Sequence, residues 1–112
     1  MKVFDLSKTG TFSHGQRRKN VFHLAEGFKT RMIELPAGGK MPLCKMEKHV
    51  IFVVLDGEVT VEMDEKTALL REKHCLITGP ASLSMQSEKG VRLLGIQIEA
   101  AAGVENAPPD ER

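Results

Sequence analysis

The sequence VIFVVLDGEVTVEM, residues 50–63, decides the expected fold. Its first six residues are apolar and rich in β-branched side chains, and the run is too short for a typical buried helix. Asp56-Gly57 follows at once. This pair between two strand-like runs is a strong hairpin signal, because glycine accepts a positive φ. Residues 58–63 then alternate polar and apolar side chains, so the stretch predicts two paired strands with a turn at Asp56-Gly57.

The rest of the chain adds short strand candidates that are separated by turn residues. Turns are expected at 36–39, 64–66, 79–80 and 89–90, each built from Pro, Gly, Asp, Glu, Lys or Ala. Short strands at this spacing, with little sign of helix, predict an all-β sandwich or barrel. The further strand candidates are residues 21–25, 29–35, 68–70, 75–77, 83–86 and 91–98.

Length and composition indicate one globular domain. The chain has 112 residues, and we expect a single domain over residues 1–99 with a flexible C-terminal tail over residues 100–112. Lys and Arg number 16 against 15 Asp and Glu, a net charge of +1, which argues against nucleic acid or an anionic membrane as partner. Asp5 interrupts the first apolar residues, so no signal peptide is visible, and two cysteines are too few for a disulfide framework. We therefore expect a cytoplasmic protein.

Residues 35–98 resemble the cupin superfamily, in particular its small, single-domain, RmlC-like members. The first family motif is G-x5-H-x-H-x3,4-E-x6-G, and this chain keeps both glycines, Gly38 and Gly57, at the family's spacing. The resemblance implies a double-stranded β-helix, the cupin jelly-roll barrel. It also implies where a metal would be held, but the two histidines and the glutamate of the motif are replaced by Cys44, Met46 and Val50.

The second family motif, G-x5-P-x-G-x2-H-x3-N, is expected around residues 72–87. In one register Leu83 takes the histidine position, and in the other Ser82 takes it. Neither register supplies a histidine. The resemblance therefore supports the fold and leaves the usual metal chemistry without its ligands.

The expected ligand pocket follows from alternation along the strand. Residues 44, 46, 50, 52 and 54 share parity, so in one continuous strand they would point to the same side, and the resemblance makes that side the barrel interior. Leu83 and Met85 would face them. These inward side chains either fill the core or line a pocket for a small apolar or amphipathic molecule. The predicted pocket residues are Cys44, Met46, Val50, Phe52, Leu83 and Met85.

No metal and no other cofactor is expected. The four histidines show no short metal-ligand spacing, and no nucleophile elbow or His-Asp pair stands out. The remaining candidate is a rearranged metal site in which Cys44 joins His49 through a bulge, with His23 or a residue of a neighbouring subunit as the third ligand.

Three functions remain open at this stage. The first is a metal-free binding or accessory protein with an apolar barrel pocket. The second is an enzyme, dioxygenase- or isomerase-like, with the rearranged metal site. The third is a structural dimer with a filled barrel. A homodimer is expected because Ile51, Val53 and Leu55 are apolar on the face that cannot line the barrel, although an N-terminal strand could also cover them.

Overall fold

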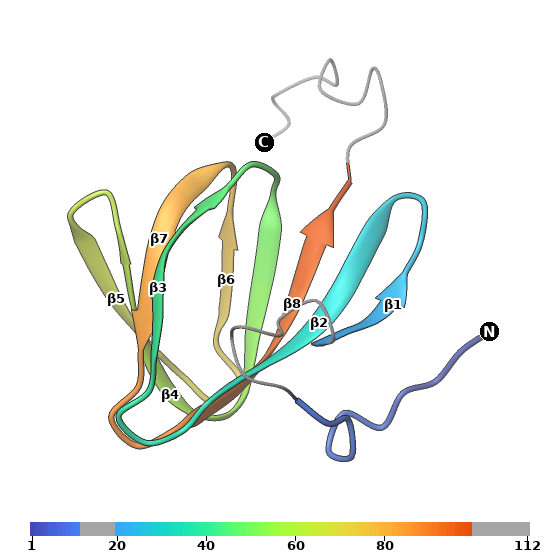
Figure 1. The fold of residues 1–112 in the computed structure, drawn as a ribbon, viewed down its shortest axis with the longest axis horizontal. Coiled ribbons are helices and arrows are strands. Elements are labelled where there is room, and N and C mark those ends of the chain that lie inside the picture. Colours follow the sequence, from blue (N-terminus) through green and yellow to red (C-terminus); the bar gives the residue numbers. More distant parts are fainter. Residues whose placement is uncertain (12–19, 100–112) are drawn as a thin grey trace.

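The computed structural model describes residues 1–11 and 20–99. The expected C-terminal tail, residues 100–112, lies outside the described residues, so the division into a domain and a tail stays a prediction. Within the described ranges the chain forms no α-helix, and no helix there could cross a membrane. The eight strands are β1 (Val21–Leu24), β2 (Phe28–Leu35), β3 (Lys40–Met46), β4 (Val50–Met63), β5 (Lys66–Arg71), β6 (Cys75–Thr78), β7 (Ala81–Gln86) and β8 (Val91–Ile98) (Figure 1).

The strands form two facing antiparallel sheets that share β4. The β8 sheet contains β1, β2, β8, the first half of β4 and β6, and the β7 sheet contains β3, β7, the second half of β4 and β5. Figure 1 shows β3, β5 and β7 on one side and β1, β2 and β8 on the other. The all-β, jelly-roll expectation, a double-stranded β-helix, is confirmed.

The expected hairpin turn at Asp56-Gly57 is wrong. β4 runs unbroken from Val50 to Met63, because each of its halves has its own partners: β6 and β8 pair with the first half, and β5 and β7 pair with the second. The positive φ of Gly57, 84°, serves a bend at a register shift between Val54 and Asp56. This bend carries the strand from one sheet into the other.

The real two-residue hairpin lies at Asp64 and Glu65. Both have positive φ, 51° and 66°, and Met63 pairs directly with Lys66 across the turn. Two successive positive φ values suit the right-handed twist of a two-residue hairpin. The turn expected at 64–66 is therefore the β4–β5 connection.

Burial along β4 changes parity at the bend. Val50, Phe52 and Val54 are 4%, 2% and 1% exposed, whereas after the bend the buried residues are Val59 and Val61. The extra residue at the bulge turns the strand by one position, so the inner face passes from even to odd numbers. One continuous core therefore fills the space between the two sheets.

Strand β3 was missing from the sequence prediction. It contains Pro42, which has no N–H to donate, and its register with β7 shifts between Met41 and Cys44. The assumption that residues 44–54 form one strand was also wrong. Cys44 and Met46 belong to β3, whereas Val50 begins β4 in the facing sheet. Residues 47–49 connect the two.

Candidate functional site

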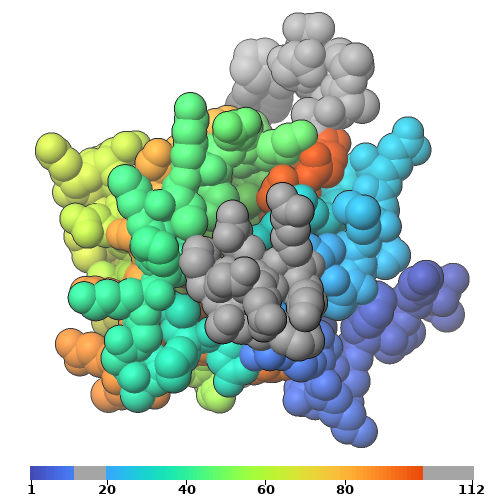
Figure 2. All heavy atoms as spheres, viewed as in Figure 1, coloured from blue at the N-terminus to red at the C-terminus, as the bar shows by residue number. Residues whose placement is uncertain are grey.

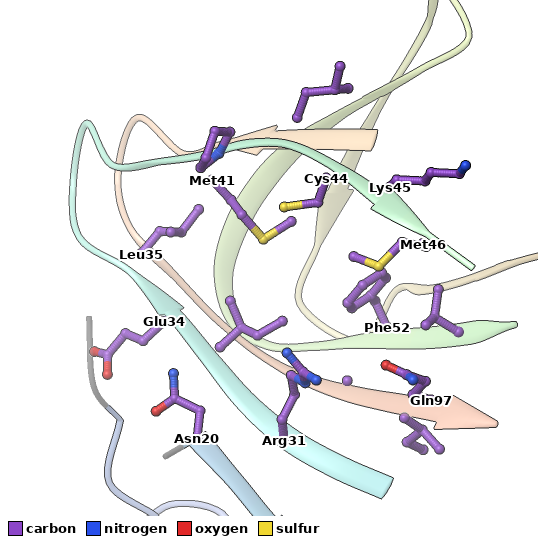
Figure 3. Close-up of a pocket in the computed structure, with 16 residues that line it drawn as sticks. Asn20, Arg31, Glu34, Leu35, Met41, Cys44, Lys45, Met46, Phe52 and Gln97 are labelled. Carbon is purple, nitrogen blue, oxygen red and sulfur yellow. The ribbon is translucent and has the colours of Figure 1, made fainter. Parts of the chain in front are cut away.

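A cavity of about 520 Å³ lies inside the barrel, between β3 on one wall and β2, β8 and the start of β4 on the other (Figure 3). The hydrogen-bonded path through the sheets begins at β1 and ends at β3, and these two strands are not paired with each other. In the space-filling view, residues of β1 and β2 and residues of β3 lie on opposite sides of the same face (Figure 2). The cavity therefore occupies the side on which the barrel is not closed by hydrogen bonds.

Strand β3 contributes three sulfur-containing side chains to the wall. Met41, Cys44 and Met46 line the cavity, and Figure 3 shows them extending from β3 toward the facing sheet. The bulge between Met41 and Cys44 leaves Leu43 72% exposed at the rim. Thioethers and a thiol are polarizable apolar groups, so this wall can adapt to an apolar ligand.

The opposite wall combines aliphatic and aromatic groups with two polar side chains. Val50 and Phe52 come from β4, while Arg31 and Gln97 come from β2 and β8 and point into the cavity. The sequence reasoning missed Arg31 and Gln97. Arg31 has the same parity as Ile33 and Leu35, and this alternation in β2 was the available signal for an inward side chain.

Four of the six predicted pocket residues line the cavity, and two do not. Cys44, Met46, Val50 and Phe52 are in its walls. Leu83 and Met85 are 0% and 2% exposed and belong to the packed core. That the cavity is a ligand site stays a prediction.

The candidate metal ligands do not come together. The His23 ring lies against the rings of Phe4 and Phe28, with centroids 5.9 and 5.7 Å away, and takes no part in the cavity. His49 is exposed and lies beside Gly79, where an added Cβ would be 3.3 Å from Nε2. Across residues 1–11 and 20–99, no group of three or more His, Cys, Asp or Glu side chains could hold a metal ion.

The residues at the cupin ligand positions do not fit the metal that the resemblance implies. Val50 offers only hydrocarbon and is 4% exposed, and Met46 offers a thioether where the family has an imidazole. Cys44 and Cys75 are both free, the first half-buried at the cavity and the second exposed on β6. A lone thiol beside a thioether does not complete a Zn, Mn or Fe site.

Two carboxylates near the rim are held by other groups. Glu99 accepts hydrogen bonds of 2.8 Å from Lys48 Nζ and from Gln97 Nε2. The Lys48 hydrogen bond is the main reason that the pKa of Glu99 lies below its usual value. Glu34 Oε1 accepts from Thr11 at 2.6 Å and from Arg92 at 3.3 Å, and its side chain points away from the cavity in Figure 3.

Comparison with known proteins gives a fold and no specific function. No protein-family model matches the sequence, and no curated protein matches it. Among solved structures, a Thermus thermophilus protein superposes with a TM-score of 0.75 at 20% identity, over 88% of this chain and 97% of that one.

Two further structures are named as cupins. A cupin superfamily protein from Desulfitobacterium hafniense has a TM-score of 0.67 at 11% identity, over 71% of this chain and 74% of that one. The cupin domain of Cnp3 from Schizosaccharomyces pombe has a TM-score of 0.64 at 20% identity, over 71% of this chain and 61% of that one. Together with the two facing sheets that share β4, these likenesses identify the fold of this chain as that of the cupin superfamily.

Proposed function

We propose that this chain is a metal-free, cupin-like binding or accessory protein that holds a small apolar or amphipathic molecule in the cavity. The observation that carries the proposal is the cavity itself. Its volume of about 520 Å³ lies within the range of roughly 300–1,000 Å³ that is typical of small-molecule sites. Such sites have mostly apolar walls with a few placed polar groups. Here Phe52, Met41 and Met46 supply the apolar surface, and Arg31 and Gln97 supply the polar groups.

The filled-barrel alternative accounts for only part of the interior. Leu83, Leu93 and Val54 are fully buried and leave no space around them for a ligand. The alternative gives no reason for the hollow beside Phe52 and Met46.

The test is a binding measurement with a cavity-filling variant. Cys44→Phe places a ring in the hollow, so we expect it to abolish ligand-induced thermal stabilisation while leaving the fold intact. Leu69→Phe is the matched control, since Leu69 is 46% exposed on β5, away from the cavity. Native mass spectrometry of the gently purified protein identifies any ligand that co-purifies. Undiminished binding by Cys44→Phe would contradict the proposal.

The enzyme alternative needs a metal, and elemental analysis tests it. We expect no stoichiometric transition metal in protein purified without a histidine tag, because Cys44 lacks partner ligands among the described residues. Near-stoichiometric metal that disappears in Cys44→Ser or His49→Ala would restore the enzyme hypothesis.

We also propose that a second copy of the chain covers the outer face of the β8 sheet. Ile51 and Val53 lie on that face, and so does Ile77, which is 67% exposed. The rival cover, an N-terminal strand, is positioned elsewhere: β1 pairs with β2 at the sheet edge, so β2 and β8 separate it from β4. A two-fold dimer would bury this patch against itself.

Light scattering at micromolar concentration tests the dimer. We expect twice the monomer mass for the wild type and the monomer mass for Val53→Glu, because an unpaired charge at the centre of an apolar contact is costly. Leu69→Glu, on the other sheet, should remain dimeric. A monomeric wild type would contradict this proposal and leave the cavity proposal untouched.

A further inference from the structure

One glutamine on β8 presents its amide to the cavity. Gln97 pairs directly with Val50 on β4, and directly paired residues of an antiparallel sheet project to the same face. Val50 is buried and lines the cavity, so the Gln97 side chain also lies on the inner face. Figure 3 shows the amide at the cavity wall, with its oxygen directed toward the middle of the cavity.

The orientation of this amide is set by a carboxylate. Gln97 Nε2 donates to Glu99 Oε2 at 2.8 Å, and Lys48 Nζ donates to Glu99 Oε1 at 2.8 Å. The Lys48 hydrogen bond holds the pKa of Glu99 below its usual value, so the carboxylate is ionised at neutral pH and can only accept hydrogen bonds. The nitrogen of the Gln97 amide must therefore face Glu99, and the oxygen must face away from it.

The other polar side chains around the cavity have partners or point elsewhere. Asn20 and Arg31 already have interactions within the protein. Glu34 accepts hydrogen bonds from two donors, and both Glu34 and Lys45 point away from the cavity in Figure 3. Gln97 Oε1, by contrast, accepts no hydrogen bond from residues 1–11 and 20–99. Among the described side chains, the polar atom left to meet a ligand is therefore an acceptor.

We propose that the cavity binds an apolar molecule that ends in a neutral hydrogen-bond donor, a hydroxyl group or an amide N–H, with that donor on Gln97 Oε1. The apolar body of the ligand lies against Phe52, Val50 and Met46. This inference rests on the proposed function and names its ligand class. A carboxylate or a ketone would place oxygen against oxygen at Gln97 and leave the amide oxygen without a donor, which is costly in an apolar cavity.

The experiment uses matched alkyl probes that differ only in the head group. Straight-chain alcohols from hexanol to nonanol supply a donor, whereas the methyl ketones and carboxylates of equal chain length supply acceptors alone. Isothermal calorimetry gives the affinities. In a Cys75→Ser background, protection of Cys44 from iodoacetamide, read by mass spectrometry, reports occupancy at the cavity wall.

The expected result is an alcohol that binds roughly fivefold or more tightly than its methyl ketone, with the carboxylate weakest. Gln97→Met keeps the length of the side chain and removes the acceptor. It should therefore bring the alcohol down to the ketone without weakening the ketone. The matched control is Gln86→Met, which should keep the preference, since Gln86 is exposed on β7 and is not part of the cavity wall.

Glu99→Gln tests whether Glu99 positions the amide. An amide at position 99 can donate as well as accept, so the Gln97 amide is free to turn either way. The preference for the alcohol should shrink and the ketone should gain affinity, because a turned amide offers its N–H to the cavity. A change that weakened alcohol and ketone alike would make Glu99 merely structural and contradict its control of Gln97.

The outcomes separate this inference from the proposed function. Equal binding of alcohol and ketone, tighter binding of the carboxylate, or a preference that survives in Gln97→Met would overturn the role of Gln97 and leave the pocket standing. Absence of binding by every probe, with Cys44 unprotected, would overturn both. Should Gln97→Met fail to fold, the ratio of alcohol to ketone affinity in Glu99→Gln decides: an unchanged ratio overturns the inference.

Discussion

The two ends of the barrel have similar residue types and different packing. Around Val54, Leu83 and Leu93 the facing sheets are filled by aliphatic side chains that are at most 1% exposed. Around Val50, Phe52 and Met46 walls that are also largely apolar, with Arg31 and Gln97 among them, surround a cavity of about 520 Å³. Hydrophobic composition therefore does not decide where a barrel is hollow. The cavity lies instead where β3 pairs with β7 but not with β1.

The bend of β4 should be the least tolerant point of the packed end. At Gly57 a Cβ would lie 2.1 Å from the Gly90 carbonyl oxygen, at a φ of 84°. We expect Gly57→Ala to lower the free energy of unfolding by about 3 kcal/mol or more, because backbone must move and a left-handed φ is strained. Chemical denaturation followed by far-UV circular dichroism suits a chain without Trp or Tyr.

Gly38 provides the matched control for that change. Its φ is also positive, 78°, but nothing lies within 4 Å of an added Cβ. Gly38→Ala should therefore cost only the conformational strain, about 1–2 kcal/mol. Equal losses at the two glycines would show that φ alone, and not the packing at the bend, sets the cost.

Two valines on one strand compare the ends of the barrel directly. Val54 is 1% exposed and away from the cavity, whereas Val50 is 4% exposed and lines it. We expect Val54→Ala to cost about 2 kcal/mol and Val50→Ala about 1 kcal/mol, because only the first opens a new void in packed surroundings. Thermal and chemical unfolding measure both. A loss at Val50 as large as at Val54 would mean that the two ends are packed alike.

The smallest expected effect concerns the ion pair between Lys48 and Glu99 near the rim of the cavity. The Lys48 hydrogen bond lowers the pKa of Glu99 from its ordinary 4.5, so the pair stabilises the fold above that pH. The contribution is lost as pH falls through the lowered pKa. Lys48→Met should reduce stability at neutral pH by less than Val50→Ala does, since the Lys48 side chain is 44% exposed.

The difference between Lys48→Met and the wild type should vanish in acid. Once Glu99 is protonated in both proteins, no charge remains for Lys48 to stabilise. Melting temperatures recorded from neutral pH to well below the ordinary glutamate value of 4.5 provide the check. A difference that persists in acid would assign the effect to packing of the lysine stem.

Local sequence predicted most strands and mistook one connection. Val91–Ile98 was predicted with its observed limits, and Phe28–Leu35 was predicted one residue short. The Asp56-Gly57 pair correctly predicted a positive φ at Gly57. That φ belongs to a bend within β4, however, and not to the hairpin turn that we expected. Whether such a pair closes a hairpin or bends a strand depends on which strands lie alongside, and that is a long-range fact.

Only part of the candidate site could be predicted, because it too depends on which strands lie side by side. Shared parity grouped Cys44, Met46, Val50 and Phe52 on one side and the cupin resemblance made that side the interior, although two strands supply them and not one. Arg31 was overlooked because a charged residue in a strand usually faces water. Its inward position became evident only beside Gly95 and Phe52, which come from distant parts of the sequence.

Local sequence was sufficient for the all-β class and for the positive φ at Gly57, since both follow from strand propensity, turn chemistry and backbone sterics within a few residues. The three-dimensional structure was needed to show that β4 serves both sheets, that Leu83 is packed while Met46 borders a cavity, and that Arg31 and Phe52 lie on either side of Gly95. Those outcomes depend on pairing between segments far apart in the chain and on the spacing between sheets, which no local pattern encodes.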